Sequence, residues 1–412
     1  MIKTIFSALT VCALLSVPQR STAATKPVKK DKPLVEYVNP FVGTDGYGNV
    51  YPGAQVPFGG IQISPDTDEH FYDCASGYKW NRASIQGFSL THLSGTGIPD
   101  LGDFLFMPVV GNVKLDPGTD EKLDDGYRSR FSHAKETASP GYYAVTLDDY
   151  NVKAELTAAV RSGIMRFTFP QTDSASVLVD LNHTLWQKCI WANIRVENDS
   201  TISGYKLVKG WGPERHIYFR AVFSKPFDGF MIYQDKKPVI YNTSRFRSNR
   251  EAWGPGLMFT ANFKTRSGEQ ICVRTSISAT GPDGTIVNMC ELNGLTFDDV
   301  RQRAVDMWNK ELSRYTVSGD DEQKATFYTS AYHAALCPFI YDDADGKYLA
   351  LDKSVQQEDG FTNLTEFSLW DTYRAFHPLM NIVHQDVQAN VANSLLAHYD
   401  KSVEKMLPYW SF

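Results

Sequence analysis

The stretch 163-GIMRFTFPQTDSASVLVD-180 indicates two β-strands joined by a turn. Its two halves, 163–169 and 175–180, are short runs of β-forming residues bounded by turn signals. Similar runs recur at 104–108, 142–147, 218–223 and 271–277. This spacing predicts antiparallel sheets, most simply a large β-sandwich.

The pattern changes near residue 295, where helical spacing replaces alternation. Residues 297–308 are predicted to form a connecting helix, with Thr296 as its N-cap and an acid at the third helical position. A second helix is expected from Glu322 to Phe339 and a third from Ala389 to Val403. Their expected apolar stripes are Ala325, Tyr328, Tyr332, Ala335 and Leu336, and Val391, Leu395, Leu396 and Tyr399. The predicted fold class is therefore β first and α afterwards.

The first 24 residues are typical of a secretory signal peptide, with Lys3, an apolar run over 5–17 and small residues up to Ala23 and Ala24, where cleavage is expected. The apolar run is too short for a permanent anchor, and no later segment is long and apolar enough. We therefore expect an exported protein, periplasmic or secreted, without a membrane span. Val11 before Cys12 is a poor match to a lipoprotein processing site.

Charge and cysteine usage exclude some functions. Loss of Lys3 and Arg20 with the leader changes the net charge from −6 to −8, which argues against a nucleic-acid partner. The remaining cysteines have no CxxC spacing, which argues against a zinc site or a disulfide scaffold, although one or two disulfides stay open. These cysteines are Cys74, Cys189, Cys272, Cys290 and Cys337.

The length of 412 residues exceeds one ordinary core, so more than one domain is expected. The charged segment 25–33 is typical of a linker. The expected divisions are a signal peptide at 1–24, the sandwich at 34–293, a helical linker at 294–320 and the beginning of a helical domain at 321–412. The ending 406-MLPYWSF-412 is apolar and aromatic, which predicts that the chain stops inside a larger helical domain.

Two loop segments carry candidate binding residues. Residues 39–67 are rich in Gly and Pro, which mark turns first but also allow close approach of a ligand to the backbone. They contain no nucleotide P-loop pattern. In 87–104, Thr91, His92, Ser94, Asp100 and Asp103 lie among small residues. A lone His is usually structural, and no GxSxG surrounds Ser94, so a loop that hydrogen-bonds to hydroxyls fits better than a hydrolase triad.

The stretch 366-EFSLWDTYRAFHPL-379 is the third candidate. Ser368 is placed to cap a helix beginning at Leu369, with Trp370, Asp371 and Arg374 near its first turn. One interpretation is a local ion pair beside core aromatics. The other is one wall of a sugar site, in which Trp370 stacks on a pyranose and the Asp371–Arg374 pair holds adjacent hydroxyls.

Taken together, these segments resemble glycoside hydrolase family 92, the calcium-dependent exo-acting α-mannosidases. Each block alone is weak, but they occur in the family's order and span the mature chain. The blocks are 39-NPFVGT-44, 51-YPGA-54 with 57-PFG-59, 64-SPDT-67, 87-GFS-89 leading to 91-THLSGTG-97, and 368-SLWDTYR-374.

The resemblance implies an N-terminal β-sandwich, a helical linker and a C-terminal (α/α)6 toroid, with the active site where the sandwich loops meet the toroid. It also implies inverting hydrolysis of terminal α-linked mannose, with α-1,2 linkages expected, assisted by Ca²⁺ that binds sugar hydroxyls. Trp370, Asp371 and Arg374 match the block that contributes to the terminal-mannose subsite, and His92 lies in the sandwich loop near it. The expected partners are mannose-containing glycans.

The sequence departs from the family in two respects. Members run to roughly seven hundred residues, and by resemblance their catalytic carboxylates and main calcium ligands lie beyond the position of Phe412, so no catalytic residue and no metal ligand is assigned in this chain. Leu90 stands where the family usually has His.

Three hypotheses follow. The first is an N-terminal fragment of such an α-mannosidase, inactive when isolated. The second is a non-catalytic carbohydrate-binding β-sandwich protein with a helical appendage. The third is hydrolysis of α-glucosides, since sandwiches joined to toroids also occur in such enzymes; the set of motifs argues against it.

Overall fold

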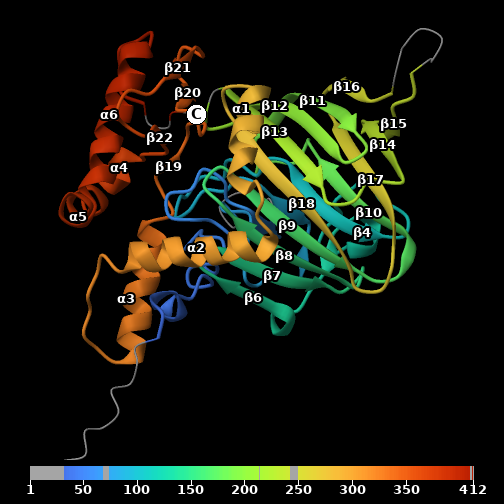
Figure 1. Cartoon of the computed structure of the whole chain (residues 1–412), viewed down its shortest axis with the longest axis horizontal. Coiled ribbons are helices and arrows are strands. Elements are labelled where there is room, and N and C mark those ends of the chain that lie inside the picture. Colours follow the sequence, from blue (N-terminus) through green and yellow to red (C-terminus); the bar gives the residue numbers. More distant parts are fainter. Residues whose placement is uncertain (1–31, 68–73, 213, 242–248, 409–410, 412) are drawn as a thin grey trace, which may run out of the picture. The chain divides into compact units, whose positions relative to one another are not determined.

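Two large antiparallel sheets form the N-terminal part of the computed structural model, as the alternating runs predict (Figure 1). The structure describes residues 32–67, 74–212, 214–241, 249–408 and 411, and Pro33–Phe412 is one compact unit. The expected signal peptide, Cys12 and most of the expected linker at 25–33 lie outside the described residues.

The strands follow one another in each sheet by antiparallel pairing throughout. The seven-stranded sheet has the order β1 (Ser64–Asp66), β3 (Gly87–Ser89), β4 (Leu105–Val110), β10 (Thr172–Asp180), β17 (Leu257–Thr265), β14 (Gly229–Gln234) and β15 (Lys237–Pro238). The nine-stranded sheet has the order β16 (Glu251–Gly254), β11 (Lys188–Asn198), β12 (Thr201–Lys209), β13 (Arg215–Phe223), β18 (Glu269–Ser278), β9 (Ser162–Phe169), β8 (Val152–Ala158), β7 (Tyr142–Leu147) and β6 (Glu136–Ser139).

The main hydrophobic core lies between these sheets, so they form a sandwich. Phe106 of β4 meets Phe219 of β13 with ring centroids 6.3 Å apart, and Phe88 of β3 lies 6.2 Å from Phe167 of β9. Side chains alternate between this core and the outside, as expected for strands with one buried face.

Two helices pack on the outer face of the nine-stranded sheet: α1 (Pro282–Met289) against β13 and β18, and α2 (Phe297–Leu312) against β8 and β9 (Figure 1). The prediction for α2 is confirmed, because Thr296 and Asp299 form a capping box. Phe297 and Val300 then pack with Tyr142 and Ile164 of the sheet.

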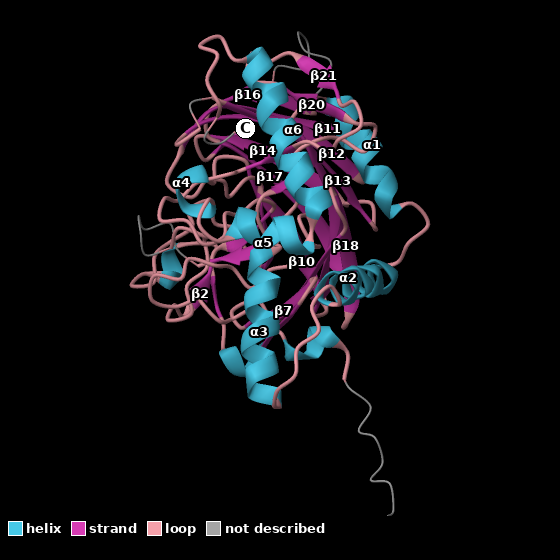
Figure 2. Ribbon diagram, turned by 90° about the vertical axis from the view of Figure 1, so that its left-hand side faces the viewer, coloured by secondary structure: helices cyan, strands magenta, loops and turns pink. Residues whose placement is uncertain are grey.

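The C-terminal part is mainly helical, with α3 (Asp321–Ala334), α4 (Leu369–Thr372), α5 (Phe376–Val383) and α6 (Gln385–Lys401) outside the strand body (Figure 2). Short two-stranded sheets, absent from the sequence prediction, interrupt it. They pair β19 (Phe339–Ile340) with β22 (Leu364–Thr365), and β20 (Lys347–Leu349) with β21 (Val355–Gln357); β2 (Ser84–Ile85) and β5 (Ser129–Arg130) form a third.

Two helix predictions need correction. The helix expected to reach Phe339 ends at Ala334, because Pro338 cannot continue a helix and Phe339 enters β19. In α6, Val391 is buried as expected, but Leu396 and Tyr399 are 59 % and 37 % exposed. The buried face instead carries Ser394 and His398, whose polar side chains bond to the segment 362–364.

The five cysteines within the described residues are all free thiols, so the one or two disulfides left open by the sequence do not form among them. In this same part of the chain, no helix combines the length and the apolar character needed to cross a bilayer.

Candidate functional site

Trp370, Asp371 and Arg374 lie together on an exposed turn. Trp370 is 49 % exposed, and Asp371 and Arg374 are also exposed. The predicted cap is wrong: Ser368 adopts a left-handed conformation (φ 38°) and makes no side-chain cap, so α4 is a single turn that ends at Thr372. The expected Asp371–Arg374 ion pair is also absent here, since the Arg374 Nε–H donates to the Tyr373 hydroxyl at 2.7 Å.

His92 lies inside the sandwich rather than on this turn. Its Nδ1 is 2.8 Å from the Gln62 carbonyl, and its Nε2 is 2.8 Å from Asp66 Oδ1. Both ring nitrogens are therefore engaged by hydrogen bonds inside the sandwich. The side chain is fully buried, and neither nitrogen is available for a sugar hydroxyl in this conformation. The predicted role of His92 near the substrate stays a prediction.

Asp66 connects two histidines, because its other oxygen lies 2.9 Å from His183 Nε2. Burial opposes ionisation of this carboxyl, but the charge of His92 and the hydrogen bonds from both histidines outweigh it and hold its pKa below the usual range. Gly77 leaves room for the pair: a Cβ there would lie 2.1 Å from Asp66 Oδ1.

The acids of the 87–104 loop are also used internally. Asp103 accepts hydrogen bonds from Arg215 and from Thr91 Oγ1, and Lys206 Nζ lies 3.3 Å away. Asp100 accepts a hydrogen bond from the Trp211 amide at 2.9 Å, which connects the loop 210–212 to the loop 87–104. The hydroxyl-binding role predicted for this loop therefore cannot rest on these two carboxylates. What remains accessible is its tip, Ser94–Gly97.

Tyr51 brings the separate loops together. Its ring centroid lies 5.2 Å from that of His92, and its hydroxyl donates to Gln55 Oε1 at 2.5 Å. Gln55 Nε2 in turn donates to the Leu336 carbonyl at 2.9 Å, at the end of α3. At Gly60 a Cβ would lie 2.4 Å from the Ile340 carbonyl oxygen. The Gly- and Pro-rich segment is thus the contact between the sandwich and the helical part.

Glu366, just before the exposed turn, is a buried acid that sequence reasoning missed. It has φ 65°, is 1 % exposed, and its Oε2 lies 3.1 Å from Cys337 Sγ, while its Oε1 has no hydrogen-bond partner. Burial, with a smaller contribution from the Asp100 charge, raises the pKa of Glu366 to about 8. It is a neutral acid at pH 7, but its burial keeps it from a ligand. Nothing in the local sequence marks Glu366 as a buried acid.

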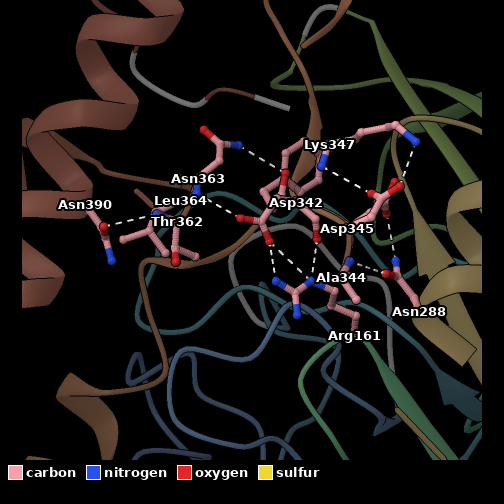
Figure 3. Close-up of polar contacts among 12 residues, drawn as sticks. Arg161, Asn288, Asp342, Ala344, Asp345, Lys347, Thr362, Asn363, Leu364 and Asn390 are labelled. Atoms are coloured by element: carbon pink, nitrogen blue, oxygen red, sulfur yellow. Dashed lines mark hydrogen bonds and ion pairs between the residues drawn. The ribbon is translucent and has the colours of Figure 1, made fainter. Parts of the chain in front are cut away.

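A polar junction centred on Asp342 holds the segment before this turn on the sandwich (Figure 3). Arg161, in the turn between β8 and β9, donates to the Asp342 carbonyl at 2.7 Å and forms an ion pair with its carboxylate. The other carboxylate oxygen accepts from the Asn363 amide at 3.0 Å. Asn363 Oδ1 lies 3.0 Å from His398 Nε2, so α6 is tied to the same centre.

The described residues do not offer a calcium cage. No cluster of three or more His, Cys, Asp or Glu side chains capable of holding a metal occurs among them. Among the candidate acids, Asp66 is bonded to two histidines, Asp103 is paired with Arg215 and Glu366 is neutral, so Asp371 is the exposed carboxylate of this group. A single oxygen ligand falls short of the six to eight that Ca²⁺ takes.

Comparison with known proteins gives consistent results. The profile of the glycosyl hydrolase family 92 N-terminal domain matches residues 37–278, and that of the family 92 catalytic domain matches 287–412. An "uncharacterized secreted glycosidase" of Arthroderma benhamiae is 30 % identical over 345 residues, which cover 75 % of this chain and 42 % of that protein.

Among solved structures, the family GH92 α-mannosidase BT3965 of Bacteroides thetaiotaomicron, in complex with mannoimidazole, is 65 % identical with a TM-score of 0.91. The match covers 92 % of this chain and 50 % of that one. The inverting mannosidase BT2199 of B. thetaiotaomicron VPI-5482 is 26 % identical with a TM-score of 0.79, over 93 % and 50 % of the two chains. The chain thus spans about half the length of these relatives. The predicted fold, a sandwich followed by the first helices of an (α/α)6 toroid, is confirmed.

Proposed function

The chain belongs to glycosyl hydrolase family 92, and we propose on that premise that it is part of an exported enzyme that removes terminal α-linked mannose, preferentially α-1,2-linked, from glycans with inversion. The observation that supports this most is the exposed turn of Trp370, Asp371 and Arg374. The chain that carries it is 65 % identical, over the matched region, to an α-mannosidase solved in complex with mannoimidazole. Export is supported by the relative described as secreted.

The turn offers the three kinds of contact that a pyranose needs. The exposed indole of Trp370 can cover the apolar face of the sugar. The Asp371 carboxylate can accept from two adjacent hydroxyls, and the Arg374 guanidinium can donate to ring or hydroxyl oxygens. The buried groups behind the turn fix the backbone that carries these side chains.

Inversion also needs a general acid and a general base about 6.5–9.5 Å apart. Among the described residues of this site, Asp371 is accessible, whereas Asp66, Asp103 and Glu366 are buried. We propose that residues 25–412 alone bind mannosides without turning them over. The test is release of mannose from α-1,2-mannobiose with Ca²⁺ present; clear turnover by these residues would contradict this proposal.

The activity itself is tested in a longer polypeptide, which also contains the region that aligns with the half of the relatives not matched by this chain. We expect it to release mannose, and Asp371→Ala to lower kcat/KM by about 100-fold or more, roughly 3 kcal/mol of lost transition-state binding. Glu404→Ala, an exposed acid after α6, is the control and should leave kcat/KM unchanged. Absence of mannose release would contradict the proposed function.

Calcium assistance stays a proposal from the family resemblance, since the residues here do not form its site. When bound, Ca²⁺ would hold and polarise the sugar hydroxyls. We expect EDTA to leave the Tm of residues 25–412 unchanged and to abolish turnover by the longer polypeptide. A drop in the Tm of residues 25–412 would show that this half holds calcium by itself.

A further inference from the structure

The outer face of the nine-stranded sheet carries a row of aromatic side chains away from the exposed turn. The strand register places Trp253 of β16 opposite Asn193 of β11, Asn193 opposite Tyr205 of β12, and Tyr205 opposite Tyr218 of β13. Trp191 lies on the same face of β11, two residues from Asn193. We call Trp191, Trp253, Tyr205 and Tyr218 the aromatic row.

The aromatic row faces outward. Trp253 is 54 % exposed and Trp191 45 % exposed, whereas their neighbours Ala252 and Ala192 are fully buried in the core. A β-bulge between Cys189 and Trp191 turns both Ile190 and Trp191 outward. Single exposed apolar side chains are ordinary, but here four neighbouring strands each carry a large ring on one face, two of them exposed tryptophans and two of them partly exposed tyrosines.

Hydrogen bonds orient two of the four rings, Trp253 and Tyr205. The Trp253 Nε1–H donates to Glu251 Oε1 at 3.1 Å, which orients the indole on its own strand. The Tyr205 hydroxyl lies 2.8 Å from His216 Nδ1, and the rings of Tyr205 and Tyr218 are 4.8 Å apart. A surface whose rotamers are already set loses little side-chain entropy when it binds a ligand.

The chemistry of this face favours a carbohydrate chain. Pyranoses present apolar C–H faces to aromatic rings and hydroxyls to polar neighbours, and Glu251, His216 and Asn193 lie among the rings. Acidic and basic side chains both lie on these strands, as in the bidentate Arg220–Glu197 contact, unlike the basic surface of one sign that favours nucleic acid. Strands are about 4.8 Å apart, so Trp253 and Tyr205 lie about 10 Å apart and suit an extended ligand.

The same strands connect the aromatic row to the candidate site. The loop before β11 carries His183, which bonds to Asp66, and the loop after β12 carries the Trp211 amide, which donates to Asp100. A chain held on the row therefore lies on strands whose ends build the rim of that site.

We propose that the aromatic row is a second glycan-binding site, which holds part of an α-mannose-containing polysaccharide at a distance from the Trp370 turn. This rests on the proposed function for the identity of the sugar. The site acts by retaining the polymer near the enzyme and takes no part in bond cleavage.

The test is affinity electrophoresis of the chain in native gels that contain soluble α-mannan, with α-glucan gels in parallel. We expect α-mannan to retard the chain, and Trp191→Ala with Trp253→Ala to weaken the Kd by about tenfold or more, near 1.4 kcal/mol. The double Phe variant W191F/W253F should retain most of the binding, because it keeps the rings. Tyr399→Ala, which removes a partly exposed ring from α6, is the matched control and should bind as the unmodified chain does. Equal Tm values for all variants would show that each folds.

Several outcomes would overturn the proposal: no retardation of the unmodified chain, equal retardation of the Ala variant, or stronger retardation by α-glucan. Sedimentation that shows a dimer dissociating in the Ala variant would assign the row to a second copy of the chain. Failure here is distinct from failure of the proposed function, because mannobiose turnover by the longer polypeptide does not need the row, and retardation does not need turnover.

Discussion

Glu366 holds a proton that an exposed glutamate would have lost at neutral pH. Its folded pKa of about 8 lies above the ordinary value of 4.5, so the folded state binds more protons than the unfolded state between these values. Its contribution to stability is therefore complete below about pH 4.5 and is lost as the pH rises through 8, by up to about 1.4 kcal/mol per pH unit.

Glu366→Gln should reduce this pH dependence, since the amide keeps the neutral shape without a titrating proton. The measurement is the free energy of unfolding in urea at pH 5, 6.5 and 8. We expect a flatter profile for the variant, with its largest advantage over the unmodified chain at pH 8. Glu404→Gln, exposed after α6, should keep the original slope. A profile for Glu366→Gln parallel to that of the unmodified chain would contradict a buried neutral acid.

Asp66 is the opposite case, an ionised carboxylate held between His92 and His183. Asp66→Asn removes a buried carboxylate that both histidines contact, and breaking a buried charged contact of this kind costs about 3 to 5 kcal/mol. Chemical denaturation at pH 7 measures this loss. Asp173→Asn, exposed on β10, should change stability by less than about 0.5 kcal/mol. A loss below about 1 kcal/mol at Asp66 would contradict a stabilising role for this buried carboxylate.

At the scale of elements, the N-terminus of α2 can be tested through its capping box. Thr296 Oγ1 accepts from the Asp299 amide at 3.2 Å, and Asp299 Oδ2 accepts from the Thr296 amide at 2.9 Å. Thr296→Ala should lower the free energy of unfolding by about 1 kcal/mol, whereas Thr296→Ser should keep most of it. Equal losses for both variants would assign the effect to packing of the threonine methyl group.

Local patterns account for most of the element predictions. A strand with one core-facing side, such as β13, alternates strictly, and α2 carries its own start signal, so each is visible in sequence. In α6 the prediction of a buried position is wrong for Leu396 and Tyr399, because Ser394 and His398 occupy part of the buried face and form hydrogen bonds there. The spacing of apolar residues does not reveal helix positions that are buried but polar.

The candidate site was predictable only where side chains act locally. The Trp370 turn is exposed, as a binding wall requires, although the resemblance and not the capping pattern pointed to it. His92 contacts Asp66 and Gln62, which are distant in sequence. Glu366 is neutral chiefly because the fold buries it, with a smaller contribution from the charge of the distant Asp100. Single-sequence reasoning has no access to such pairings.

For the whole molecule, the Asp342 junction adds to the contact that the Gly- and Pro-rich segment makes between the sandwich and the helical part. Arg161, in the turn between β8 and β9, forms an ion pair with Asp342, and Asp342 accepts a hydrogen bond from the Asn363 amide (Figure 3). The Asn363 side chain in turn contacts His398 of α6. The Arg161 side chain is 17 % exposed and that of Asp342 is 1 % exposed. The penalty of about 3 to 5 kcal/mol for breaking a fully buried pair is therefore reduced here to about 2 to 4 kcal/mol.

We expect Arg161→Ala to destabilise the region around Asp342 locally, because the core between the two sheets does not depend on this junction. Hydrogen exchange is the measurement: amides of Tyr341 and Asn363 should exchange at least about 30-fold faster, while amides of β9 and β10 keep their protection. Arg130→Ala removes an exposed pair with Asp149 and should change neither set. If β9 and β10 lost protection together with Tyr341 and Asn363, the sandwich and the helical part would unfold as one cooperative unit, and the junction would stabilise the whole chain rather than hold the Trp370 turn in place.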